Sequence, residues 1–97
     1  MRIISKKALR EFWQEYIEAE EPLRRWFEIA ERAGWQNLAE TKVDCPSAES
    51  VGTCTVFNIG GNKYRLIAYI NYRIGRVYVL HVLTHKEYDT DKWKKDC

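Results

Sequence analysis

The sequence has 97 residues, of which 45% are apolar, including four Trp, six Tyr and three Phe. This length and composition suit one globular domain over residues 1–97 and exclude a disordered tail. The formal net charge of +2 conceals an uneven distribution, because residues 1–50 carry eight Lys/Arg and ten Asp/Glu (net −2) whereas residues 51–97 carry eight and four (net +4).

No targeting segment or membrane span can be recognised. The basic N-terminus leads into a helical pattern, and no apolar run approaches the roughly 20 residues that a span requires. The three cysteines, Cys45, Cys54 and Cys97, include no CxxC pair and are odd in number, which argues against a disulfide framework or a zinc ribbon. The sequence therefore predicts a cytoplasmic protein with reduced thiols and no membrane partner.

The first half of the chain predicts a short strand and two amphipathic helices. Residues 2–4 are the strand candidate, and Ser5 is the expected N-cap of a helix in which apolar residues recur at three- and four-residue spacing over residues 9–17. Glu20-Glu21-Pro22 has the composition of a first helical turn and predicts a second helix, for which Gly34 is the expected C-cap. Both helices are expected to cover a sheet.

The second half predicts three antiparallel strands. The turns between them are expected at Gly60-Gly61-Asn62 and at Gly75. Both faces of the strands carry apolar residues, which indicates that both faces are at least partly covered or concave. The strands are expected at residues 55–59, 63–72 and 76–84.

Two segments are less regular. Residues 44–50 have the composition of a loop. A short helix over residues 90–95, capped by Asp89, has Trp93 as its one large apolar anchor and is expected to be loosely held. The predicted fold class is α+β, with two N-terminal helices packed on a mostly antiparallel sheet in the order β-α-α-β-β-β-α.

The strand region lacks acidic residues. No Asp or Glu occurs between Ser50 and Lys86, a surface composition that suits a polyanion such as nucleic acid. Alternation along residues 63–72 turns Arg65 away from the face expected to carry the helices. That helix-facing set is Tyr64, Leu66, Ala68, Ile70 and Tyr72, and the basic residues of the interval are Lys63, Arg65, Arg73, Arg76 and Lys86 with His81 and His85.

The strand region also resembles a known family. The runs VFNIGGNKYRLIAYI (residues 56–70) and VYVLHVLTHKEYD (residues 77–89) closely resemble the HigB toxins of bacterial toxin–antitoxin pairs, within the RelE/ParE superfamily. The match is specific over residues 56–89 and rests on the pattern of elements over the first 45 residues. The resemblance implies a RelE-like fold and a messenger-RNA endonuclease, usually acting in the ribosomal A site. It also implies a HigA-like helix-turn-helix antitoxin that neutralises the toxin and represses the shared operon.

Residues for metal-independent RNA cleavage can be named. The 2′-hydroxyl of the substrate is the nucleophile, so the site must accept its proton, stabilise charge on phosphorus and protonate the leaving oxygen. Arg65 is the candidate for the phosphate, and Tyr64-Arg65-Leu66 matches the YRL-type arginine that is an active-site residue in the wider superfamily. His85 suits either proton transfer, Lys86 would add a second cation, and Tyr88 could stack on a base or donate its hydroxyl.

Each of these residues also has a structural interpretation. Arg65 could be a surface arginine paired with a carboxylate, and His85 could brace the turn before the last helix. His85 and Lys86 can share a site only if the strand ends or twists there, because successive strand residues point to opposite faces. Tyr88 could pack against the terminal helix, and His81, among Val and Leu residues, is expected to be a core residue.

The remaining basic residues are candidate RNA contacts, namely Lys63, Arg73, Arg76 and Lys92. Metal chemistry has little support, because His81 and His85 would lie roughly 13 Å apart on a strand, and no cofactor is expected. A net charge of +2 is low for this superfamily, which leaves open weaker RNA affinity or another target. The alternatives to the nuclease are a ParE-like gyrase poison and a non-catalytic RNA-binding module of the same fold.

Overall fold

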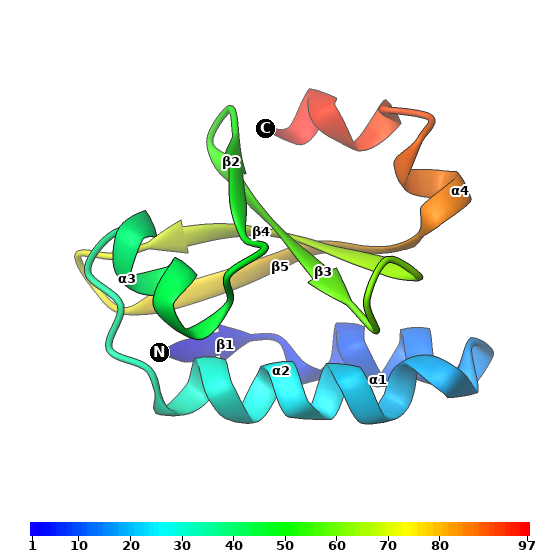
Figure 1. Cartoon of the computed structure of the whole chain (residues 1–97), viewed down its shortest axis with the longest axis horizontal. Helices are drawn as coiled ribbons and strands as arrows, with labels where there is room; N and C mark the ends of the chain where they lie inside the picture. The colour runs from blue at the N-terminus through cyan, green and yellow to red at the C-terminus, as the bar shows by residue number, and fades with distance from the viewer.

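The computed structural model describes all 97 residues and has an α+β architecture in which one sheet separates two unequal layers. Figure 1 shows α1 and α2 on one side of the sheet and the C-terminal segment on the other. The elements are β1 (Arg2–Ile4), α1 (Lys6–Glu15), the 3-10 helix η1 (Ile17–Ala19), α2 (Glu20–Arg32), α3 (Leu38–Asp44), β2 (Glu49–Val51), β3 (Cys54–Ile59), β4 (Tyr64–Asn71), β5 (Arg76–Thr84), α4 (His85–Tyr88) and the 3-10 helix η2 (Lys92–Asp96).

The sheet has five strands in the order β1-β5-β4-β3-β2. Strand β1 pairs with β5 in parallel, and the other neighbours are antiparallel. The predicted α+β class and the β3–β4–β5 meander are therefore confirmed. The predicted order β-α-α-β-β-β-α is incomplete, because it lacks α3 and β2. The loop predicted over residues 44–50 is wrong in part, because residues 49–51 pair with β3 as the edge strand β2.

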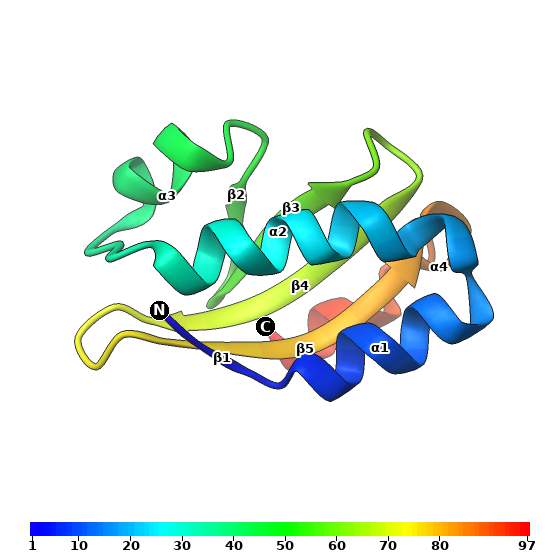
Figure 2. The ribbon, with the colours of Figure 1, turned by 90° about the horizontal axis from the view of Figure 1, so that it is seen from below.

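Helices α1 and α2 cover one face of the sheet, as Figure 2 shows from below. Their buried residues pack with the helix-facing side chains of β4, so the predicted alternation along that strand is confirmed. Burial of each large apolar side chain contributes about 1.5–3 kcal/mol. The shared core includes Leu9, Trp13, Leu23, Trp26, Phe57, Tyr64, Leu66, Ala68 and Ile70.

The end of α2 differs from the prediction. Ala33, in an extended conformation, is the C-cap, and Gly34 is absent from the residues with a left-handed φ. A glycine cap is unnecessary because the N-terminal ammonium of Met1 donates hydrogen bonds to the carbonyl oxygens of Ala30 and Glu31, both at 3.1 Å. A positive charge at this position also suits the negative end of the helix dipole.

The C-terminal segment is held firmly against the opposite face, contrary to the prediction. Trp93 is only 3% exposed and packs with Cys54, Val56 and Ile67. A disulfide joins Cys54, at the start of β3, to Cys97. The expectation of reduced thiols is therefore wrong for these two cysteines, because the fold brings residues 43 positions apart into contact.

Cys45 is the free cysteine. Burial, together with the neighbouring Asp44 carboxylate, raises the pKa of the Cys45 thiol to about 11. The thiol is therefore protonated at neutral pH and is a poor nucleophile there.

A β-bulge in β5 decides the position of His81. Ile67 pairs with His81 but Ala68 pairs with Val79, so Leu80 is the extra residue. Val79 and Val82 consequently both pack toward the helices, whereas His81 lies beside Ile67 on the opposite face. The expectation that His81 is a core residue is therefore wrong.

None of the helices is long and apolar enough to cross a membrane.

The disulfide gives a first prediction. We expect Cys97→Ser to lower the free energy of unfolding by about 2–4 kcal/mol without reductant, because the unfolded chain loses its cross-link. Urea denaturation followed by tryptophan fluorescence measures this change, and Cys45→Ser is the matched control. Reductant should destabilise the native protein and the control but leave Cys97→Ser unaffected. Equal free energies of unfolding for Cys97→Ser and the native protein without reductant would show that the Cys54–Cys97 disulfide does not stabilise the fold.

The Cys45 thiol gives a second prediction. We expect its alkylation by iodoacetamide in the folded protein to be slow at pH 8 and to accelerate as the pH rises toward 11, where the thiolate forms. Mass spectrometry of the protein sampled over time measures the rate. A free thiol peptide under the same conditions is the control, and Cys45 reacting as fast as that peptide at pH 8 would show that the pKa is not raised.

Candidate functional site

Arg65 is buried on the face of β4 opposite the helices. It is 8% exposed, and its Nη1 donates hydrogen bonds to the carbonyl oxygens of Asn62 at 3.0 Å and Tyr64 at 3.2 Å. The centre of its guanidinium lies 5.0 Å from the centroid of the Tyr88 ring. Arg65 therefore stabilises the glycine turn and contacts α4 through Tyr88. The alternative of a surface arginine paired with a carboxylate is wrong.

Part of the guanidinium still reaches the surface. Besides Nη1, the nitrogens of Arg65 make no hydrogen bond within the chain. They are nevertheless not fully buried, because Trp26 Nε1 is the one fully buried side-chain polar atom that lacks a hydrogen-bond partner. Those nitrogens consequently retain contact with solvent. A fixed guanidinium with free N–H groups is suited to a phosphate oxygen.

The strand register places α4 beside Arg65. Arg65 pairs with Leu83 across β4 and β5, and the backbone N–H of His85 donates to the Lys63 carbonyl at 3.0 Å. Helix α4 begins immediately after the strand because Thr84 and Glu87 form a capping box. Strand β5 thus ends just before His85 and Lys86, which is the condition under which these two residues could share a site.

The side chains of α4 differ in their freedom. The His85 side chain is 55% exposed, and its Nε2 lies 3.6 Å from the Asp89 carboxylate. Lys86 is exposed and makes no ion pair. The Tyr88 ring also stacks on Trp93, with centroids 5.1 Å apart, as the packing alternative expected. The Tyr88 hydroxyl makes no hydrogen bond within the chain, so this group, more than the ring face, is left for a substrate.

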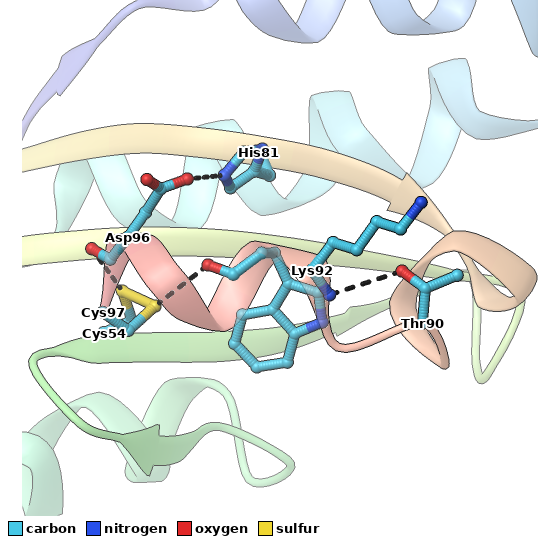
Figure 3. A network of polar contacts seen from close by, with 7 residues as sticks. Cys54, His81, Thr90, Lys92, Asp96 and Cys97 are labelled. Carbon is cyan, nitrogen blue, oxygen red and sulfur yellow. Dashed lines mark hydrogen bonds and ion pairs between the residues drawn. A yellow bond between two sulfur atoms is a disulfide. The ribbon is translucent and has the colours of Figure 1, made fainter.

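A second polar cluster lies beside η2 and was not found from the sequence. His81 Nε2 lies 2.6 Å from the Asp96 carboxylate, as Figure 3 shows. His81 borders a depression of about 310 Å³. No local pattern links these two residues, because the bulge in β5 and the disulfide at Cys97 together bring them into contact. The depression is lined by His81, Leu83, Glu87, Thr90, Lys92, Trp93 and Lys95.

The predicted RNA contacts are dispersed. Lys63 forms an ion pair with Glu18 at 3.1 Å, and Lys92 borders the depression. Arg73 and Arg76 lie at the β4–β5 hairpin, at the end of the sheet away from α4, as Figure 1 shows by the positions of these elements. No three or more His, Cys, Asp or Glu side chains gather closely enough to hold a metal ion.

Comparison with known families defines the class of protein. A model of the HigB toxin family, the RelE-like toxic component of a toxin–antitoxin system, matches residues 19–91. The chain therefore belongs to this family, and the assignment made from residues 56–89 is confirmed.

Individual relatives agree with this assignment. The chain is 28% identical to the mRNA interferase toxin HigB of Escherichia coli K12 over 92 residues, which cover 92% of this chain and 88% of that protein. It is equally similar, with the same coverage, to the mRNA interferase HigB of Shigella flexneri. The identity to the mRNA interferase HigB of Escherichia coli O6:H1 is 29%, with 92% and 89% of the two chains covered.

The burial of Arg65 gives a third prediction. We expect Arg65→Ala to lower the free energy of unfolding by about 2–4 kcal/mol, because two charge-assisted hydrogen bonds and the contact with Tyr88 are lost. Urea denaturation measures the change. The exposed Arg73 supplies the control, since Arg73→Ala should stay within about 0.5 kcal/mol of the native protein. An equally small effect of Arg65→Ala would show that this arginine has no bracing role.

Proposed function

We propose that this chain is the toxin of a type II toxin–antitoxin pair and an endoribonuclease that cleaves mRNA on the ribosome in the cytoplasm. Membership of the HigB toxin family supports the toxin class, and the mRNA interferase names of its relatives support the substrate. On this proposal the two N-terminal helices and the meander form a RelE-like arrangement, and a HigA-like helix-turn-helix antitoxin neutralises the protein.

One observation carries the catalytic part of the proposal. Arg65 is fixed under Tyr88 at the point where α4 presents His85 to solvent. An immobile guanidinium, an accessible imidazole and a free phenolic hydroxyl are thereby attached to adjoining elements. These are the group types that general acid–base cleavage of a phosphodiester requires.

The reaction follows from these groups without a metal. The 2′-oxygen of the ribose bonds to phosphorus while its proton passes to one of the two proton-transferring groups, His85 or Tyr88. The bond from phosphorus to the 5′-oxygen breaks, and that oxygen takes a proton from the other group. The free nitrogens of Arg65, with Lys86, offset the charge that develops on the phosphoryl oxygens. The products are a 2′,3′-cyclic phosphate and a 5′-hydroxyl.

The exposed position of His85 gives a fourth prediction. We expect His85→Ala to reduce cleavage by about 10²–10⁴-fold, because an acid–base group is lost, while the stability stays within about 0.5 kcal/mol of the native protein. Primer extension on mRNA from induced cells maps the cuts, and labelling of the fragments by polynucleotide kinase without phosphatase treatment identifies the 5′-hydroxyl. Lys7→Ala is the control, because Lys7 lies on α1, on the other side of the sheet, in an exposed ion pair with Glu11.

Primer extension together with a gyrase assay separates the competing functions. Undiminished cutting by His85→Ala would remove this residue from the mechanism. Intact mRNA together with trapped DNA breaks in a gyrase assay would favour the gyrase poison. Intact mRNA with intact DNA would favour an RNA-binding module without turnover.

A further inference from the structure

Two tyrosines are stacked on the open part of the sheet face that carries Arg65. Tyr69 and Tyr78 pair directly across β4 and β5, with ring centroids 6.1 Å apart and an interplanar angle of 23°. Tyr69 is 41% exposed. Because Arg65, Ile67 and Tyr69 alternate along one strand, the pair shares the face of Arg65 and lies about 13 Å from it along β4.

Arginines extend this face beyond the tyrosines. Arg76 pairs with Asn71, one step further along the same face, and Arg2 of β1 pairs with Arg76 in parallel. Neither arginine makes an ion pair, whereas Arg24 and Arg25 of α2 are each paired with a glutamate. The arginines beside the tyrosine pair therefore keep their charge available to a ligand.

Tyr88 does not offer an equally open ring. It contacts both the Arg65 guanidinium and the Trp93 indole, so a base has little access to it. The Tyr69–Tyr78 pair is the other stacked aromatic pair on this face, and it is the one that no helix covers.

We propose that Tyr69 and Tyr78 form a stacking platform for a base of single-stranded RNA, and that Arg76 and Arg2 contact the phosphates beyond it. This proposal rests on the proposed function and assigns the track of the substrate from α4 to the β4–β5 hairpin. Aromatic side chains interleaved with unpaired cations recognise single-stranded nucleic acid, since stacking supplies contact area and cations follow the backbone.

A purely structural role does not account for the whole arrangement. Cross-strand aromatic pairs stabilise hairpins, which explains why the two rings touch. It does not explain the exposure of Tyr69 in an interval without Asp or Glu, next to two arginines without carboxylate partners. A ligand with π faces and negative charge matches both properties.

The test is binding of a fluorescein-labelled 2′-O-methyl RNA oligonucleotide, which lacks the nucleophilic hydroxyl and stays intact. We expect anisotropy titrations at low salt to show about 5- to 150-fold weaker binding for Tyr69→Ala and Tyr78→Ala, and near-native binding for Tyr69→Phe. Leu80→Ala is the matched control, because Leu80 is 39% exposed on the same strand as Tyr78. Arg76→Ala should make the dependence of affinity on salt less steep.

An oligonucleotide of the same length with abasic sites supplies a second readout on the native protein. We expect it to bind more weakly than the complete oligonucleotide, and to bind native protein and Tyr69→Ala equally. Unchanged affinity of Tyr69→Ala, equal binding of the two oligonucleotides by native protein, or no binding at low salt would each overturn the platform. Tyrosine-dependent binding without mRNA cleavage would instead leave the platform standing and remove the proposed nuclease function.

Discussion

The contact between the Arg65 guanidinium and the Tyr88 ring is the interaction on which the candidate site depends. It attaches α4 to the sheet, and α4 in turn carries His85 and Lys86. The hydrogen bonds of Arg65 to Asn62 and Tyr64 fix the same guanidinium to the glycine turn. Because Arg65 braces the fold, loss of activity on its replacement could follow from destabilisation as well as from loss of the proposed phosphate contact. The exposed His85 is the more informative position.

The C-terminal segment makes this contact durable. Trp93 stacks on Tyr88, its Nε1 donates to the Tyr88 carbonyl at 2.9 Å, and the Cys54–Cys97 disulfide anchors the chain just beyond it. The layer opposite the helices is thus small but tightly connected. It covers the part of the sheet near β3 and leaves the Tyr69–Tyr78 pair open, which divides that face into a packed region and an accessible one.

Local pattern was sufficient to predict helices α1 and α2, the meander and the facing of β4. Apolar spacing located α1 and α2, glycines marked the β3–β4 turn, and strict alternation turned Arg65 away from the helices. The candidate residues Arg65, His85 and Tyr88 rested on the resemblance of the strand region. Their adjacency follows from strand register, which a hairpin with a short turn largely determines.

Features that depend on contacts between distant residues were not predictable. The bulge at Leu80 shifts His81 to the opposite face, and a one-residue change of register has no signature in apolar alternation. The disulfide was missed because its cysteines lie 43 positions apart in an odd set of three. The Asp96 partner of His81 depends on both. Strand β2 was missed because three residues at a sheet edge carry too little pattern.

In the proposed function, RNA lies on the sheet face opposite α1 and α2, with its scissile phosphate beside Arg65. Titration of the ¹⁵N-labelled protein with an uncleavable RNA oligonucleotide, followed by amide chemical shifts, tests it most directly. RNA bound to this face should give the largest shifts in α4, at the β3–β4 turn and along β4 and β5, and should leave α1 and α2 unaffected. Shifts concentrated in α1 and α2, with α4 unchanged, would contradict it.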